Sequence, residues 1–125
     1  MIKEREFTEY IIIHHSNTSD DRDLGLEDLK DSKYHFIIRR NGLIEIGLDS
    51  DAEGEYHTES IDICLIGKSE FDERQFEGLR DLVQLTLRLH PDCKIVGHGD
   101  LDDTDCPGFD VVKWFSEAIP SIHRP

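Results

Sequence analysis

The chain has 125 residues and a formal net charge of −14 at pH 7, a length at which one domain, residues 1–125, buries most of its apolar surface. The negative charge argues against binding along a nucleic-acid backbone, which requires clustered lysines and arginines. The longest apolar runs span only a few residues and the start, MIKEREFTEY, is charged, so we expect neither a signal peptide nor a membrane anchor. These features together predict a protein that is made in the cytosol.

The first predicted strand ends in two histidines. YIIIHHS, residues 10–16, is rich in β-branched residues and precedes the turn-forming sequence SNTSDD. Because side chains alternate across a strand, His14 and His15 face opposite sides, so only one of them easily joins a given site. The other is expected to be a hydrogen-bonded surface or core histidine. The following segment LGLEDLKD, residues 24–31, allows at most two turns of helix.

A hairpin and a buried strand follow. Residues 34–48 predict two strands joined at Asn41-Gly42, a dipeptide that favours a tight hairpin turn. DSDAEGEYHTES, residues 49–60, is a polar loop, and IDICLIG, residues 61–67, is apolar nearly throughout, as expected for a strand covered on both faces. The chain contains three cysteines, an odd number that argues against a disulfide framework. Cys64 is most simply a small buried apolar residue, and Cys93 has no evident partner.

Two helices and one further strand complete the pattern. Asp72 is a plausible N-cap and Pro91 a stop for an amphipathic helix, whose apolar residues recur at helical spacing: Phe76, Leu79, Leu82, Val83 and either Leu87 or Leu89. KIVGH, residues 94–98, reads as a short strand. Asp110 can cap a closing helix through VVKWFSEAI that ends at Pro120.

This order of elements predicts an α/β fold, with a single mixed β-sheet of about five strands flanked by helices. The two strands that carry histidines, residues 10–14 and 94–98, both run into polar loops. If these strands lie side by side and parallel, their loops emerge at the same edge of the sheet, where such proteins place their sites.

The segment VGHGDLDDTDCPGFD holds two ligand-type residues, His98 and Cys106, at the two ends of one loop. Imidazole nitrogen and thiolate sulfur are ligands that zinc accepts in tetrahedral geometry. The end of the first strand offers a third ligand, His14 or His15. Three protein ligands and one open position are typical of catalytic zinc, whereas structural zinc usually has four protein ligands.

Five motifs in the same order resemble the zinc-dependent N-acetylmuramoyl-L-alanine amidases of type 2, a family that includes the lysozyme of T7-type phages and the peptidoglycan recognition proteins. They span most of residues 3–115 and read KEREFTEY, IIIHHSNT, KYHFIIRRNG, IDICLIG and VGHGDLDDTDCPGFD. The resemblance implies an amidase-like or peptidoglycan-recognition-like fold.

The resemblance also implies the site residues. The family's zinc ligands fall on His14, His98 and Cys106, its tyrosine near the metal on Tyr34, and its residue two before the cysteine on Thr104. Hydroxyl donors at Tyr34 and Thr104 would stabilise negative charge that develops on the amide oxygen. Taken without the family, Tyr34 reads as an ordinary strand aromatic and Thr104 as a loop-capping hydroxyl.

Three departures from the family pattern concern the surroundings of this site. The segment before Tyr34 is short, which predicts a lower cleft wall. The loop before the central strand is reduced to EGEYHTES, with His57 as the counterpart of that loop's histidine. Four aspartates crowd the metal loop, where solvation and turn formation are the simple explanations and one of them could orient His98: Asp100, Asp102, Asp103 and Asp105.

The resemblance predicts a monomeric zinc (Zn²⁺) hydrolase that cleaves the bond between N-acetylmuramic acid and L-alanine in peptidoglycan, as a phage endolysin or a relative. Such a protein stays in the cytosol until it is released to the cell wall. A peptidoglycan-binding module without catalysis is the alternative, but such modules typically lack the cysteine ligand. The resemblance further implies a regulatory role, because the lysozyme of T7-type phages also binds and inhibits the phage RNA polymerase.

Overall fold

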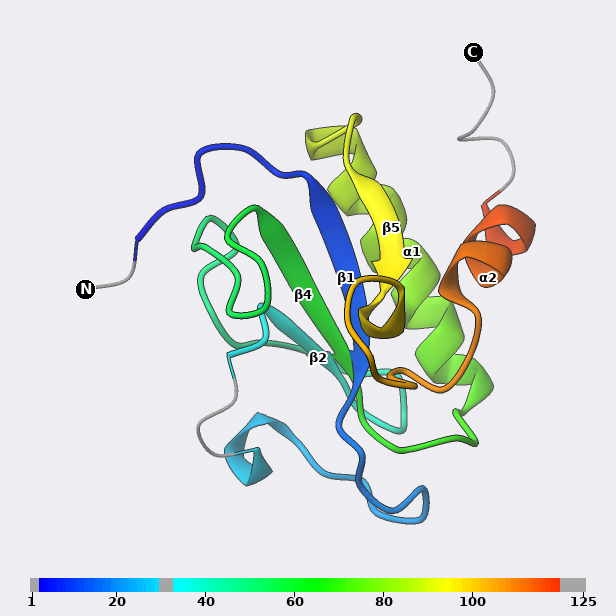
Figure 1. Cartoon of the computed structure of the whole chain (residues 1–125). Helices are drawn as coiled ribbons and strands as arrows, with labels where there is room; N and C mark the ends of the chain where they lie inside the picture. Colours follow the sequence, from blue (N-terminus) through cyan, green and yellow to red (C-terminus); the bar gives the residue numbers. More distant parts are fainter. Residues whose placement is uncertain (1–2, 30–32, 120–125) are drawn as a thin grey trace.

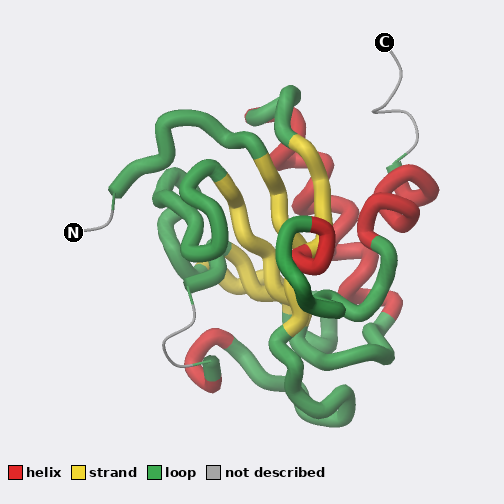
Figure 2. The backbone as a smooth tube through the Cα atoms, viewed as in Figure 1, coloured by secondary structure: helices red, strands yellow, loops and turns green. Residues whose placement is uncertain are grey.

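The computed structural model describes residues 3–29 and 33–119, which form one sheet with helices and long loops around it (Figures 1 and 2). Lys30 and Asp31, the end of the expected first helical segment, and Pro120, the expected stop of the last helix, lie outside the described residues. Among the described residues, no helix is long and apolar enough to cross a membrane. The elements in chain order are β1 Tyr10–His15, η1 Leu26–Asp28, β2 Phe36–Ile38, β3 Ile44–Ile46, β4 Ser60–Leu65, α1 Glu73–Leu89, β5 Lys94–Gly97, η2 His98–Asp100 and α2 Val111–Ala118.

The five strands form a mixed sheet in the order β3-β2-β4-β1-β5. β1 is parallel to both β4 and β5, β2 is parallel to β4, and β3 is antiparallel to β2. The expected single mixed sheet of about five strands is thus confirmed, and so is the parallel pairing of the two strands that lead to histidines. Because β1 and β5 are neighbours and parallel, the loops that follow them leave the sheet at one edge.

The two faces of the sheet differ in what covers them. One face packs against α1 and α2 through a core that includes Ile11, Ile13, Ile61, Ile63, Leu65, Leu79, Leu82, Val83, Leu87, Val111 and Phe115 (Figure 1). Strand alternation turns His14, Asp62 and Cys64 to the opposite face. There the chain before β2 packs on Cys64 and its buried neighbours, mainly through Leu24, Leu26, Leu29 and Tyr34. His14, one of the predicted zinc ligands, therefore lies on the face away from the long helices.

Helix α1 begins and packs as its sequence predicts. The Asp72 carboxylate accepts a hydrogen bond from the Arg74 backbone N–H at 2.8 Å, and the Gln75 side chain accepts one from the Asp72 N–H at 2.9 Å. Of the two alternatives for its last buried position, Leu87 is 7% exposed and Leu89 is 70% exposed. The buried stripe therefore ends at Leu87, and the helix ends before Pro91.

Replacing Asp72 by alanine should lower the urea midpoint of unfolding at neutral pH, because the first turn of α1 loses its cap. Hydrogen bonds from the side chain and the backbone of Arg74 lower the pKa of Asp72 to about 2. A carboxyl whose pKa is depressed in the folded state stabilises it above the unfolded pKa, and this stabilisation disappears as the pH falls through the folded pKa. The midpoint difference between the wild type and Asp72→Ala should therefore be constant above about pH 5 and vanish near about pH 2. A difference that does not change with pH would contradict this origin.

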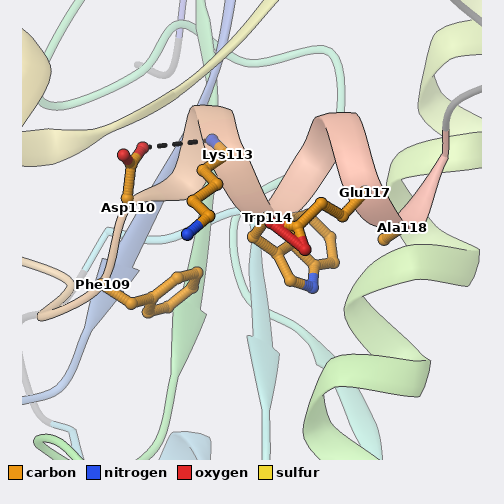
Figure 3. A pocket seen from close by; sticks show the side chains of 6 residues that line it. All are labelled: Phe109, Asp110, Lys113, Trp114, Glu117 and Ala118. Atoms are coloured by element: carbon orange, nitrogen blue, oxygen red, sulfur yellow. Dashed lines mark hydrogen bonds between the residues drawn. The ribbon is translucent and has the colours of Figure 1, made fainter.

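The remaining elements match the sequence with small differences. Asn41-Gly42 forms the turn between β2 and β3, where Gly42 has a φ of 90°. The Asp110 carboxylate caps α2 by accepting a hydrogen bond from the Lys113 N–H at 3.1 Å (Figure 3). The expected strand over residues 94–98 is wrong by one residue, since β5 ends at Gly97 and His98 begins the short helix η2. The Asp100 carboxylate causes this turn by accepting a hydrogen bond from the Gly97 N–H at 2.7 Å.

Candidate metal centre

His14 reaches the site edge from the interior of the sheet. It is the fifth residue of β1, lies beside Cys64 of β4 in register, and is 1% exposed. The β-branched run before His14 favours a strand. Because side chains alternate along a strand, the imidazole of His14 points away from the helices. His15 faces the other way, as expected, and only its backbone N–H contributes here, by donating to the sulfur of Cys106 at 3.3 Å.

The other two ligand-type residues come from the turn and loop after β5. The loop closes on itself because the Gly99 N–H donates to the Cys106 carbonyl at 2.8 Å. A Cβ atom at Gly99 would lie 2.4 Å from the backbone oxygen of Thr104, so this close approach requires glycine. The tight closure brings Cys106 back to the start of the loop, where His98 lies.

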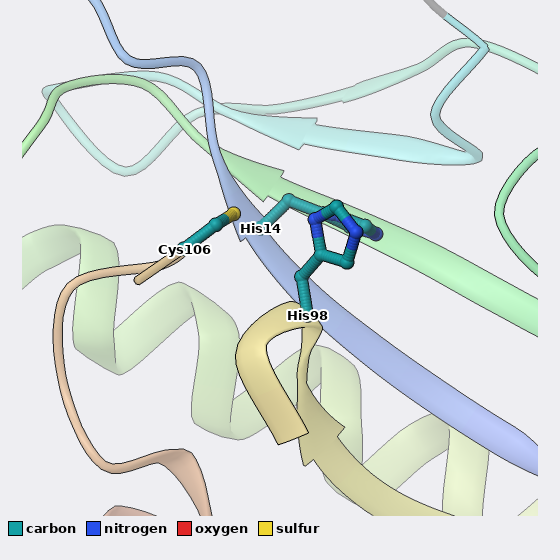
Figure 4. A group of neighbouring side chains, drawn as sticks. All are labelled: His14, His98 and Cys106. Carbon is teal, nitrogen blue, oxygen red and sulfur yellow. The ribbon is translucent and has the colours of Figure 1, made fainter. Parts of the chain in front are cut away.

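His14, His98 and Cys106 form one cluster, in which their ligand atoms all lie within 4.8 Å of one another (Figure 4). Ligand atoms around a tetrahedral zinc are about 3.5 Å apart, so one ion fits between them with small side-chain adjustments. Two imidazoles and a thiol are a donor set that suits zinc, and three ligands leave one position open. The structure thus brings together the three ligands that the sequence predicts and leaves His15 out.

Carboxylates hold the two imidazoles. Nε2–H of His14 donates to Oδ1 of Asp62 at 2.8 Å, and Nε2–H of His98 donates to Oδ2 of Asp102 at 2.9 Å. In both rings Nδ1 is then the nitrogen left for a metal. Burial lowers the pKa of His14 despite the nearby Asp62 charge, so its ring is neutral, as a ligand must be. Asp102 is one of the four loop aspartates for which the sequence suggested such a role.

The thiol of Cys106 is buried beside the two histidines. Burial raises its pKa above the ordinary value, and the hydrogen bond from the His15 backbone N–H opposes this rise only in part. Without a cation the group is therefore a protonated thiol. A metal ion at the cluster would favour the thiolate, which is the form that ligates zinc.

Two tyrosines line the cluster. The ring of Tyr34 lies 5.2 Å from that of His14, and burial raises the pKa of Tyr34, so its phenol stays protonated and able to donate. Tyr56 packs against His14 and His98 at 4.4 and 4.9 Å between ring centroids, and its hydroxyl lies 3.4 Å from that of Tyr34. Tyr34 therefore lies beside His14, and it precedes β2 rather than forming part of the strand.

The structure places Thr104 next to a residue of the cluster and His57 away from the cluster. The hydroxyl of Thr104 accepts a hydrogen bond from the backbone N–H of Cys106 at 3.3 Å. This contact is the loop-capping role expected of Thr104 without the family. His57 does not reach this cluster. Its ring packs on Tyr10 at 5.0 Å and lies 3.8 Å from the carboxylate of Glu9, near the start of β1.

Cys64 and Cys93 are buried, and all three cysteines are free, as expected.

Sequence reasoning missed two residues of the site, Asp62 and Tyr56. Asp62 had a visible signal, because it is an acidic residue inside the apolar strand IDICLIG and is completely buried. Tyr56 lies in a polar loop without a period, and nothing in its neighbourhood indicates that this loop folds over the histidines.

A hollow of about 560 Å³ lies beside α2, and its lining does not include Asp62 or Tyr56 (Figure 3). Its lining is partly aromatic and includes Phe109 and Trp114. None of the five site residues predicted from the sequence lines it.

Comparison with known proteins shows the family to which the chain is related. The family model of N-acetylmuramoyl-L-alanine amidase matches residues 4–109. The endolysin of Escherichia phage T7 is 31% identical over 136 residues, which cover 92% of this chain and 90% of that protein. The endolysin of Enterobacteria phage T3 is 32% identical, with the same coverage.

Solved structures show the same fold. The endolysin amidase LysCS from Clostridium intestinale superposes with a TM-score of 0.79 at 18% identity, covering 94% of this chain and 87% of that chain. The wild-type Drosophila recognition protein PGRP-LB gives a TM-score of 0.74 at 22% identity, covering 93% of this chain and 84% of that chain. By its sequence and its fold, the chain belongs to the type 2 N-acetylmuramoyl-L-alanine amidase family.

Proposed function

We propose that this protein is a zinc-dependent amidase that hydrolyses the bond between N-acetylmuramic acid and L-alanine in peptidoglycan. The observation that carries the proposal is the cluster of His14, His98 and Cys106, which offers three ligands for zinc and one open position. Membership of the amidase family and similarity to phage endolysins support the substrate class.

The cluster and the side chains around it have different tasks in this proposal. Zinc, when bound, would supply a Lewis acid that polarises the amide carbonyl and makes water acidic enough to attack near neutral pH. His14, His98 and Cys106 would hold the ion, while Asp102 orients the ring of His98. The protonated hydroxyl of Tyr34 would donate a hydrogen bond to the amide oxygen as negative charge develops on it.

A non-catalytic peptidoglycan-binding module is the alternative within the same family. Such a module would bind muropeptides and leave them intact, whereas an amidase releases peptides with a free N-terminal L-alanine. The presence of Cys106 favours the enzyme, because a buried thiol beside two imidazoles completes the ligand set. Incubation of the zinc-loaded protein with peptidoglycan, followed by mass spectrometry of the soluble products, distinguishes the two.

Thr104→Ala should lower kcat less than a change at Tyr34, because the Thr104 hydroxyl already bonds to the backbone of Cys106. A reduction of about tenfold or less is expected, together with little change in zinc content. Steady-state kinetics and metal analysis of the same preparation measure both. A larger loss of turnover than in Tyr34→Phe would assign the main oxyanion donor to Thr104 instead.

An endolysin role places the protein in the cytosol until the wall becomes accessible. The phage T7 and T3 relatives are endolysins, and the chain covers most of their length. Expression in a bacterial cytosol should therefore leave cells intact until the membrane is permeabilised, for example with chloroform. Lysis before permeabilisation would contradict this order of events.

The RNA polymerase partnership implied by the resemblance stays a prediction. The first shared motif, KEREFTEY at residues 3–10, packs on the rest of the protein. The Arg5 backbone N–H donates to the Asp51 carbonyl, and its guanidinium donates to the Ala52 carbonyl. The purified protein would be mixed with the polymerase of its source phage or of a T7-type phage. Binding and transcription would be compared with a variant changed only at the exposed Phe7. Absence of binding at micromolar concentration would leave wall hydrolysis as the sole activity.

A further inference from the structure

Asp62 is a carboxylate in the middle of the sheet, in the strand that reads SIDICL, where every residue is buried. Its side chain is 0% exposed. A charge removed from water in this way is costly unless hydrogen bonds and an opposite charge compensate it. The contacts around Asp62 show which of these two compensations the protein itself provides.

Each carboxylate oxygen of Asp62 has a polar side chain within hydrogen-bond distance. Oδ1 accepts from Nε2–H of His14 at 2.8 Å, and Oδ2 lies 3.0 Å from the hydroxyl of Ser60. The backbone N–H of Asp62 donates to Nδ1 of His35 at 2.9 Å. Nε2–H of His35 in turn donates to the carbonyl of Ala52 at 2.8 Å.

None of these hydrogen bonds comes from a lysine or arginine side chain. Both ring nitrogens of His35 are occupied in the manner of a neutral imidazole, with one accepting and one donating. The guanidinium of Arg5 interacts electrostatically with the Asp62 carboxylate, but its hydrogen bonds go to Ala52 and Thr8.

We propose that Asp62 is a positioning residue for the metal ion, acting through His14. By accepting from Nε2–H it fixes one tautomer and one orientation of the ring, so the lone pair of Nδ1 is available to the cluster with His98 and Cys106. Its negative charge makes the imidazole a stronger ligand and is itself compensated when a dication binds. This inference rests on the zinc site of the proposed function.

Two substitutions separate the charge from the hydrogen bond. In Asp62→Asn the amide keeps the volume, its oxygen can accept from His14, and its NH₂ can donate to Ser60, whose hydroxyl can donate to the carbonyl of His57 at 2.7 Å. Only the charge is lost. In Asp62→Leu the acceptor is lost too, and Nε2–H of His14 remains without a partner.

Zinc affinity, measured by competition with a chromophoric chelator, is the readout. The dissociation constant should rise by about tenfold in Asp62→Asn and by up to about a hundredfold in Asp62→Leu, the range found for residues that orient a metal ligand. The melting temperature of the metal-free Asn variant should equal or exceed that of the wild type, since a buried charge that has no hydrogen-bonded lysine or arginine is removed.

Thr86→Val is the matched control. Thr86 is 5% exposed and donates to the carbonyl of Leu82 within α1, on the helix side of the sheet. This nearly isosteric change removes a buried hydrogen bond away from the cluster. It should lower the melting temperature of the metal-free protein and leave the zinc dissociation constant unchanged.

Nitrogen-15 NMR of the wild-type histidines tests the proposal without any variant. In the metal-free protein the His14 ring should be protonated at Nε2 and unprotonated at Nδ1. The opposite tautomer, or an unchanged zinc affinity in Asp62→Asn and Asp62→Leu, would overturn the role of Asp62. If the wild type itself binds no zinc, the proposed function fails instead, so the two failures are distinguishable.

Discussion

Cys106→Ser is expected to lose its zinc under mild chelation and to lower amide hydrolysis by more than about a hundredfold, beyond the usual effect of residues that only orient a ligand. Serine is protonated at neutral pH, so it offers a neutral hydroxyl where zinc requires a thiolate. The fold should survive, because Cys106 lies in a loop between β5 and α2, and both cores consist of other residues.

Cys93→Ser is the matched control for that substitution. Cys93 is also 8% exposed but belongs to the core on the helix side of the sheet, so its change should affect stability and not zinc content. Metal analysis, circular dichroism and hydrolysis of peptidoglycan would be measured on both variants. A Cys106→Ser protein that retains one tightly bound zinc per chain would remove Cys106 from the ligand set.

Tyr34→Phe is expected to lower kcat by roughly ten- to a thousandfold, the scale for losing a hydrogen-bond donor to the transition state. Only the hydroxyl is removed, so the contact between this ring and His14 remains and zinc content should stay near that of the wild type. KM should change little, because the donor acts mainly on charge that develops during the reaction. Steady-state kinetics on a soluble muramoyl peptide measure both constants.

Tyr56→Phe is the control that the neighbouring ring provides. The hydroxyl of Tyr56 lies 3.4 Å from that of Tyr34, and the two rings stack with centroids 5.9 Å apart. Its loss should reduce kcat less, because we assign oxyanion stabilisation to Tyr34. Wild-type turnover in Tyr34→Phe would return that residue to ordinary aromatic packing.

The parts of the fold that could be predicted from the sequence depend on local patterns. The β-branched run before His14, the Asn41-Gly42 turn and the capping of α1 by Asp72 each act within a few residues. The expected strand over 94–98 extends one residue too far. The following turn is capped by Asp100, three residues after Gly97. Such side-chain caps decide where a short element stops, and alternation of apolar residues does not reveal them.

The parts of the site that could not be predicted depend on register between distant strands. Asp62 meets His14 only because β1 and β4 pair in parallel with Ile12 opposite Asp62. A shift of one residue would turn Asp62 to the helix side. Tyr56 reaches the histidines through the path of an irregular loop. By contrast, His98 and Cys106 could be grouped in advance with one of His14 and His15, because the ends of neighbouring parallel strands meet at one edge. The family resemblance then selected His14.

The central claim is that the cluster of His14, His98 and Cys106 cleaves the muramoyl–alanine amide when it holds zinc. The most direct test is mass spectrometry of purified peptidoglycan after digestion by the zinc-loaded protein. Protein from which a chelator has removed the zinc serves as the blank. We predict peptides with a free N-terminal L-alanine together with uncut glycan strands, and neither product in the blank. Cleavage within the glycan strands, or muropeptides that all keep the muramoyl–alanine bond, would contradict the claim.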